Sequence, residues 1–496
     1  MRVGGFVVAL AAAACTLGPD YHRPPLSPAA GYTPAALPAE AGGAAGSPEQ
    51  AQHFVVGRDI QSDWWTLYRC PKLAALVRAA LAANPDLDTA AANLRQAHFQ
   101  VQVARTAQFP TVNGQFNASR QEFSGAPFGL PSLRETFSLY TPALNLSWSP
   151  DLFGATRRQI EGARAQAAYQ RFQLEAARVS VSANVVVTAI QAAALRAEIA
   201  ATERIVAIDR RLLAVAQRRL AIGATARSDV LAQQTALAQT EAGLPGLRQQ
   251  LQGARDRLAV LAGRFPSQGP GADIDLDELH LPETLPVSLP SALIGQRPDI
   301  AAADATLHAA TAQVGVATAN LLPQLSISAQ AGSIATVPND IFGPGTAIWS
   351  IGGQLTQPLF DAGKLREQRR IAIAAMQAAA AGYRSTVLGA FQDVAHVLAA
   401  LEADGDKVAV QDTAARSAAD SLRLAQAQYA SGGVAFLTLL NAEAADKQAQ
   451  IAVIEARAAR LTDTAALFQA MGGGWWNRPD APDPAGPPDT VAAAGG

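Results

Sequence analysis

Few residues in this 496-residue chain could carry out covalent or metal chemistry. There are two cysteines, Cys15 and Cys70, and six histidines scattered along the chain. Two cysteines do not provide the clustered spacing of a zinc site. We recognise no nucleophile–base pair and no glycine-rich phosphate loop, so the sequence predicts neither an enzyme nor a bound cofactor. The formal net charge of −2, without a basic stripe, argues against a nucleic acid as partner.

Cys15 follows a short apolar leader, residues 1–14, which reads MRVGGFVVALAAAA. A membrane-spanning helix needs about 20 apolar residues, so the leader suits a secretory signal peptide instead. Small residues before Cys15 and a proline-rich segment after it resemble a bacterial lipobox, which implies cleavage there and attachment of lipid such as palmitate. Thr16 stands where inner-membrane lipoproteins typically carry Asp, which favours the outer membrane. A disulfide with Cys70 is arithmetically possible, but it would tie the leader to the start of the folded chain.

The sequence contains an internal duplication, which is the signature of a repeated architecture. NPDLDTAAANLRQA at 84 recurs as RPDIAAADATLHAA at 297, and LAIGATARSDVLAQQ at 220 recurs as YASGGVAFLTLLNAE at 429. We expect two copies of one helix–hairpin–helix–helix unit. The predicted organisation is a signal peptide at 1–14, a lipid-anchored extended segment at 15–71, structural repeats at 72–282 and 283–472, and a disordered tail at 473–496.

Long proline-free runs predict long helices. No proline occurs from 151 to 244 or from 359 to 478, and glycines at 223 and 432–433 divide each run. The predicted helices span 155–221, 224–262, 364–430 and 434–470. The longer ones would each measure about 100 Å, far beyond an ordinary globular helix, so we expect coiled-coil or helical-barrel elements. Pro245 is expected to break or kink the helix over 224–262.

Four strand-like runs lie between these helices, near 111–119, 137–149, 324–332 and 347–357. In each run apolar residues alternate with Ser, Thr, Asn or Gln, and charged residues are nearly absent. A half-buried soluble sheet also alternates, but uncharged polar partners favour a membrane β-barrel with a polar interior. Phe137 and Leu139 have the opposite parity to Leu144, so we expect a bulge or break near Pro142.

Four strands are too few to close a membrane barrel. An open strand edge in lipid would leave backbone N–H and C=O groups without partners. We therefore expect an oligomer in which two chains supply eight strands or three supply twelve. The sequence alone does not choose between these numbers.

The order of the motifs resembles the TolC-like outer-membrane efflux proteins, in particular the NodT-like lipoprotein subgroup that serves resistance-nodulation-division (RND) pumps. The motifs are CTLGPDYHRP, DWWTLYRCPKLAALVRAALAANPDL, SWSPDLFG, IGATARSDVLAQ, QPLFDAG and YASGGVAFLTLLNAE. The resemblance implies a homotrimer, with a twelve-stranded barrel in the outer membrane and a long α-helical barrel in the periplasm. It also implies a periplasmic adaptor (membrane fusion) protein and an inner-membrane RND-type pump as partners. Drugs and other toxic small molecules would pass through passively.

The same resemblance places the periplasmic gate and the adaptor-docking region at the two helix turns. The matching residues are Ile222, Gly223, Asp229, Val230 and Leu231 in the first turn, and Tyr429, Gly432, Leu439, Leu440 and Glu443 in the second. Family members often carry an acidic residue just before the second-turn tyrosine, where this chain has Gln426 and Gln428. The candidate gate charges therefore shift to Arg218, Arg219, Arg227 and Asp229, although these residues would equally suit a solvated helix face. Cys70 replaces an aspartate that is frequent in the family, and we assign it no role.

Two other functions fit parts of the pattern. A structural periplasmic coiled-coil lipoprotein would use the long helices but would have no use for the alternating hairpins. An outer-membrane duct for protein or polysaccharide export would use both features. The sequence does not name the exported substrate.

Overall fold

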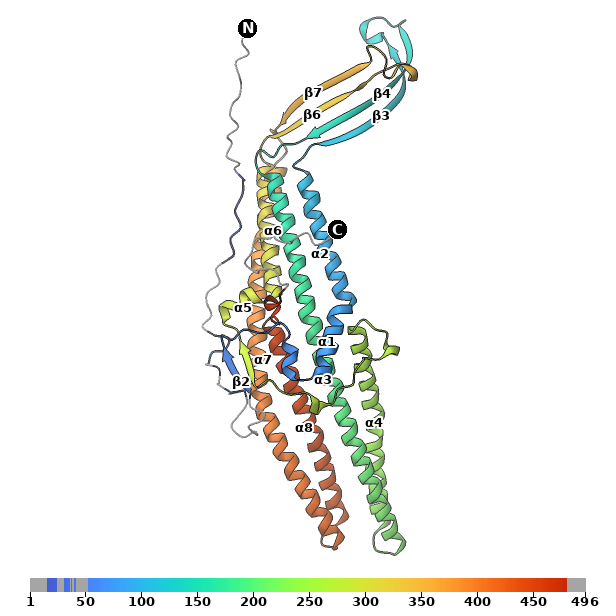
Figure 1. Cartoon of the computed structure of the whole chain (residues 1–496), viewed down its shortest axis with the longest axis vertical. Helices are drawn as coiled ribbons and strands as arrows, with labels where there is room; N and C mark the ends of the chain where they lie inside the picture. Colours follow the sequence, from blue (N-terminus) through green and yellow to red (C-terminus); the bar gives the residue numbers. More distant parts are fainter. Residues whose placement is uncertain (1–15, 25–30, 36, 38–39, 42–51, 480–496) are drawn as a thin grey trace. The chain divides into compact units, whose positions relative to one another are not determined.

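A computed structural model of the chain describes residues 16–24, 31–35, 37, 40–41 and 52–479. The predictions for the signal peptide, for Cys15 and for the tail beyond Pro479 fall outside these residues. The described chain divides into two compact units, and Figure 1 labels its helices and strands. Unit 1 comprises residues 16–24, 94–170 and 303–383, and unit 2 comprises the described residues within 26–93, 171–302 and 384–496.

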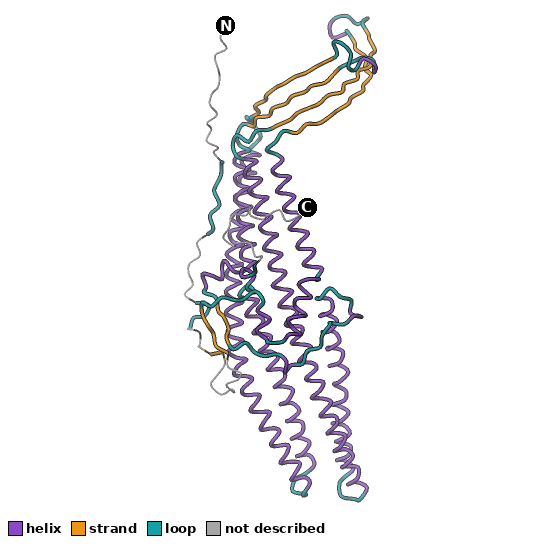
Figure 2. Tube along the Cα trace, in the orientation of Figure 1, coloured by secondary structure: helices purple, strands orange, loops and turns teal. Residues whose placement is uncertain are grey.

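Unit 1 contains an antiparallel sheet of four strands (Figure 2). The strands are β3 (Thr111–Ser124), β4 (Arg134–Trp148), β6 (Gln324–Ser333) and β7 (Ala347–Thr356), in the order β3-β4-β6-β7. They coincide with the four runs expected from the alternation, and the first hairpin is longer than expected because its strands extend to Ser124 and back to Arg134.

The strand register places the apolar residues on one face of this sheet. One row of directly paired residues consists of Val112, Leu146, Ala329 and Ile351, and the next row, on the opposite face, consists of Asn113, Asn145, Gln330 and Ser350. Directly opposed residues share a face, so over these rows one face is apolar and the other carries uncharged polar groups. The apolar face remains exposed: Val112 is 60% exposed and Ile351 is 71% exposed.

The bulge or break expected in β4 at Pro142 is not in the pairing with β3, whose register is continuous. The interruption lies on the other side, where the ladder with β6 stops at Ala143 and only an isolated bridge from Tyr140 to Ala335 follows. Tyr140 donates its backbone N–H to the Ala335 carbonyl, and the backbone groups of every second residue in a strand point to the same side. Pro142 therefore has its backbone nitrogen on the side of β6, where it has no N–H to donate. The strand β4 itself continues through Pro142.

The two repeats contain helices of equal length. The first copy has α2 (Pro85–Thr106), α3 (Ala155–Ala221) and α4 (Arg227–Leu261), and the second has α6 (Pro298–Ala319), α7 (Lys364–Ala430) and α8 (Phe436–Ala470). Their lengths are 22, 67 and 35 residues in both copies. Short helices α1 (Pro71–Ala83) and α5 (Pro290–Gln296) precede α2 and α6. Helices α4 and α8 begin slightly later than expected because Ala226 and Ala435 are extended N-caps.

Pro245 does not break α4, which is one continuous helix on both sides of it. A proline inside a helix costs about 3 kcal/mol, through the lost hydrogen bond and a clash with the preceding turn. Leu244 and Leu251 on the same helix are buried, and burial of such side chains contributes a stabilisation of similar size. Tertiary packing therefore offsets the local penalty, and the predicted break was wrong.

The main apolar core lies in unit 2, around Trp64. This residue belongs to a short 3-10 helix, η2 (Trp64–Tyr68), and its ring stacks on Phe468 of α8 at 5.1 Å. Tyr68 is fully buried and its hydroxyl donates to the Leu461 carbonyl over 2.8 Å. One window of α3 is apolar enough to suggest a membrane helix, but 61% of that window is buried inside the protein, as in a core helix.

Residues near both ends of the chain join this unit, and here two expectations need correction. The segment 15–71 is not extended throughout, because it ends in the 3-10 helix η2. Its strand β2 (Gln52–Val56) pairs in parallel with β5 (Thr284–Val287), and the short strand β1 (Glu40–Ala41) pairs with β2. The tail is folded as far as Pro479: a 3-10 helix, η7 (Trp475–Asn477), follows Gly472–Gly474. Trp475 donates its indole N–H to the Gln296 carbonyl over 2.7 Å, and Arg478 binds Glu175 through two nitrogens. Polar and glycine-rich composition predicted disorder, but these anchors outweigh it.

Residues 16–24 form an N-terminal strap along α3 and α6 in unit 1. Arg158 of α3 is almost completely buried and donates to Asp20 and to Glu161, each over 2.7 Å. The Tyr21 hydroxyl donates to Asp304, and its ring stacks on His308 at 4.4 Å. The strap is therefore held by charged hydrogen bonds as well as by packing.

We predict that Arg158→Ala releases the strap. Loss of its hydrogen bonds to charged groups should cost about 2 kcal/mol, which should speed chymotrypsin cleavage after Tyr21 in the purified protein by roughly tenfold or more. Arg369→Ala changes an exposed arginine of α7 and should leave the cleavage rate unchanged. Equal rates for both variants would show that Arg158 does not hold the strap.

Candidate gate at the helix turns

The predicted gate residues lie around two turns that belong to unit 2 and appear at the same end of it (Figure 1). One turn joins α3 to α4 and the other joins α7 to α8. Each turn has a glycine in the left-handed region, Gly223 with φ 72° and Gly432 with φ 79°. In each, the residue after the glycine donates its N–H five residues back, from Ala224 to Arg219 and from Gly433 to Gln428, over 2.8 Å. This pair of Schellman caps ends both long helices in the same way.

The second turn is closed by an apolar cluster. Phe436 and Leu439 of α8 are buried with Ala425 of α7, and Leu440 packs against them. The Tyr429 ring lies 5.4 Å from the Phe436 ring. This cluster positions Tyr429 and Leu439, two of the residues predicted from the sequence.

Arg219 links the two hairpins. Its guanidinium group, at the end of α3, lies 4.7 Å from the centre of the Tyr429 ring at the end of α7. A cation–π contact of this kind contributes about 0.5–1 kcal/mol at an exposed site. It joins two of the residues predicted from the sequence, and their spacing in the sequence does not reveal it.

The first turn is held by polar contacts instead. The Thr225 hydroxyl donates to the Asp229 carboxylate over 2.7 Å. Asp229 lies in the first turn of α4, where a negative charge is favoured by the helix dipole. Val230 is buried beside it and Leu231 is half exposed.

The remaining predicted residues are not brought together. Arg218, Arg227 and Gln426 are exposed, and among residues 52–479 the two arginines form no ion pair. Both carboxylate oxygens of Glu443 in α8 are buried. Burial and the charge of Asp209 in α3 raise the pKa of Glu443 to about 7.

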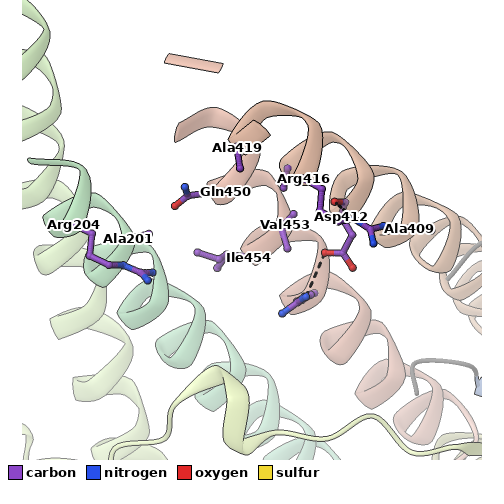
Figure 3. Close-up of a pocket in the computed structure, with 11 residues that line it drawn as sticks. Ala201, Arg204, Ala409, Asp412, Arg416, Ala419, Gln450, Val453 and Ile454 are labelled. Atoms are coloured by element: carbon purple, nitrogen blue, oxygen red, sulfur yellow. Dashed lines mark hydrogen bonds and ion pairs between the residues drawn. The ribbon is translucent and has the colours of Figure 1, made fainter. Parts of the chain in front are cut away.

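Sequence reasoning missed a groove of 730 Å³ in unit 2, away from the turns (Figure 3). Its lining comes from α3, α7 and α8 and consists of Ala201, Arg204, Ala409, Asp412, Ala415, Arg416, Ala419, Gln450, Val453, Ile454 and Arg457. Arg457 pairs with Asp412 over 3.3 Å, as the dashed line in Figure 3 marks. The signal in the sequence was the spacing of small residues at 409, 415 and 419 on one helix face.

An exposed apolar sheet face, a polar opposite face and duplicated 67-residue helices define a TolC-like outer-membrane channel. Comparison with known proteins supports this assignment. A family model described as outer membrane efflux protein matches residues 76–264 and 289–473. The pyoverdine export outer membrane protein OpmQ of Pseudomonas aeruginosa is 32% identical over 460 residues, which cover 90% of this chain and 94% of OpmQ.

Two further proteins support the same assignment. The probable efflux pump outer membrane protein TtgC of Pseudomonas putida is 29% identical over 479 residues, 95% of each chain. The solved outer-membrane channel OprN has a TM-score of 0.83 and 28% identity, with 93% of this chain and 100% of OprN covered. The chain belongs to the outer membrane efflux protein family, and the resemblance inferred from the motifs is confirmed.

We predict that Gly432→Ala loosens the second turn. A side chain in the left-handed region costs about 1–2 kcal/mol, so amide hydrogen exchange of residues 428–434 should accelerate about tenfold. Gly253→Ala is the matched control, because Gly253 lies inside α4 with open space around it and no positive φ. That variant should be neutral or slightly protective. Unchanged exchange in Gly432→Ala would contradict the cap assignment.

Proposed function

We propose that this protein is the passive outer-membrane conduit of a tripartite efflux system. A periplasmic adaptor protein and an inner-membrane RND-type pump would deliver small molecules to it. The observation that carries the proposal is the four-stranded sheet with an exposed apolar face and a face of Ser, Asn and Gln. Such a sheet suits a wall between lipid and a water-filled lumen. Passage of cargo through such a conduit would need no covalent step.

The open edges of the sheet support an oligomer, for which we propose the three chains implied by the resemblance. β3 and β7 are the outer strands of the order β3-β4-β6-β7, and an unpaired edge in lipid costs several kcal/mol for each polar group. Pairing β7 of one chain with β3 of the next would satisfy both edges. Three chains would then form a barrel of twelve strands, with the paired long helices forming an α-helical barrel in the periplasm.

The two turns support a gate at the periplasmic end. The contact between Arg219 and Tyr429 joins the hairpins, so its loss would favour their separation. Adaptor binding would bias the same equilibrium by contacting one arrangement better than the other. The groove lined by Arg204, Arg416 and small residues of α7 is compatible with adaptor contact along the hairpins.

The proposed cargo is a small molecule. The relatives are described as exporters of pyoverdine or as efflux pump components, which favours this cargo over protein or polysaccharide. The structural-scaffold alternative leaves the amphipathic sheet without a role. A heat-modifiable trimer that passes ions after insertion into liposomes would exclude that alternative.

We also propose that Cys15 is the lipidated first residue of the mature chain. The strap that follows it runs along unit 1 and is held by Arg158. This arrangement supports a lipid that directs the chain to the outer membrane and holds its N-terminus there, while the barrel is the main membrane anchor.

We predict that Asp229→Ala and Arg218→Ala each raise single-channel conductance in planar bilayers. Asp229 holds its turn through Thr225, and Arg218 contributes charge at the end of α3. Arg219→Ala should raise the open probability about two- to fivefold, the equivalent of about 0.5–1 kcal/mol. Arg211→Ala, an exposed arginine about two turns earlier on α3, is the control. Unchanged behaviour in all three test variants would refute the gate assignment.

We predict that Cys15→Ser, exported by a cleavable signal peptide, still yields trimers in the outer membrane, in reduced amount. The reason is that apolar bands of about ten residues per strand hold a barrel in lipid without an acyl chain. Membrane fractionation and unheated gel electrophoresis would measure this. A fully soluble product would overturn the barrel proposal.

A further inference from the structure

A buried polar layer in unit 2 has no part in the proposed conduit. It is formed by Asp209 of α3, Gln233 and Thr240 of α4, and Glu443, Asp446 and Lys447 of α8. We call these six residues the buried polar layer. It connects α8 to the α3–α4 hairpin close to the turns.

Specific contacts join the three helices in this layer. The Lys447 ammonium group donates to the Thr240 hydroxyl over 3.1 Å, and that hydroxyl lies 3.2 Å from an Asp209 carboxylate oxygen. Gln233 donates its side-chain N–H to the Asp209 backbone carbonyl over 3.3 Å. Asp209 is thus the point at which α3, α4 and α8 meet.

The layer has more buried acceptors than donors. Both carboxylate oxygens of Glu443 are buried without a hydrogen-bond partner among the described residues, and the same holds for Oε1 of Gln233 and Oδ1 of Asp446. Gln233 is fully buried and Asp446 is 7% exposed. An ionised carboxylate in such a place is costly because nothing replaces its hydration. A proton on Glu443 would remove the charge and supply an O–H donor that the layer lacks.

The charges facing Glu443 do not neutralise it. On α3, the nearby charge is the carboxylate of Asp209. On its own helix, Asp446 accepts a hydrogen bond from Gln450 over 2.7 Å. Lys447 donates its hydrogen bond to Thr240. The α4 residues of the layer are neutral, and the nearby Glu241 pairs with Arg210. On α7, Leu422 and Ala425 belong to the neighbouring apolar cluster around Phe436, and Asp420 and Arg423 pair with each other at the surface.

These surroundings change the proton affinity of Glu443. Burial is the larger cause and repulsion from Asp209 the smaller, and together they raise the pKa of Glu443 from 4.5 to about 7. Burial also raises the pKa of Asp209 and of Asp446. The packed state binds the Glu443 proton more tightly than a separated state would, so the packing of α8 against the α3–α4 hairpin is most stable in acid. This stability falls as the pH rises from the ordinary pKa of a glutamate through about 7.

We propose that the buried polar layer is a proton-controlled latch between α8 and the α3–α4 hairpin. Protonated Glu443 holds the helices together, and its ionisation beside Asp209 loosens α8. Only the last step, that a loosened α8 favours opening at the turns, rests on the proposed function. The ligand of this site is the proton itself, so periplasmic acidity would regulate the channel.

Hydrogen–deuterium exchange of the purified full-length protein in detergent tests the latch. After correction for intrinsic exchange, the protection of residues 436–450 should fall about tenfold between about pH 6 and about pH 8. Glu443→Gln keeps the side-chain shape without the titration, and should abolish this fall. Glu402→Gln, an exposed glutamate of α7, should preserve it. Asp209→Asn removes the repelling charge and should move the midpoint to lower pH.

The outcomes separate this proposal from the channel proposal. An equal fall in protection in the wild type and in Glu443→Gln, or no fall in the wild type, would overturn the latch even if the protein conducts ions. A fall that depends on Glu443 in a protein that does not conduct would overturn the channel proposal and leave the latch standing. If Glu443→Gln does not fold, an unshifted midpoint in Asp209→Asn would still refute the latch.

Discussion

The structure depends on the need of every strand to satisfy its backbone hydrogen bonds. In unit 1 the inner strands β4 and β6 have partners on both sides, while β3 and β7 have a partner on one side only. The exposed apolar face beside these edges suits lipid, where water cannot satisfy the remaining N–H and C=O groups. This requirement is the reason for proposing that the sheet closes with sheets of other chains, while the number of three chains comes from the resemblance to TolC-like proteins.

The duplication gives two hairpins with equal helix lengths and the same glycine caps, but their chemistry has diverged. The first turn is held by the polar pair Thr225 and Asp229, whereas the second is held by the apolar cluster around Phe436. The buried polar layer is also unequal, because α8 supplies two carboxylates to it and α4 supplies only neutral groups. Two halves that share a backbone design can thus respond differently to charge.

Much of the fold was predictable because its signals are local. The bounds of α3 and α7 follow from proline-free runs that end at a glycine, and the strands follow from alternation with a period of two. The errors came where tertiary contacts opposed a local signal. Pro245 is accommodated within α4 because that helix packs well on both sides of it, and Gly472–Gly474 lead into buried Trp475 rather than into disorder.

The candidate gate was predictable as two turns, but not as a set of contacts. The sequence by itself determined the repeat, because the two copies can be compared directly. It also determined the helix and strand types and the alternation of apolar with uncharged polar residues, because these depend on neighbours a few positions apart. Only the tertiary structure decided that Arg219 meets Tyr429 and that Glu443 faces Asp209. The members of each pair lie in different halves of the chain, and which side chains meet depends on how two long helical hairpins pack, which no local pattern encodes.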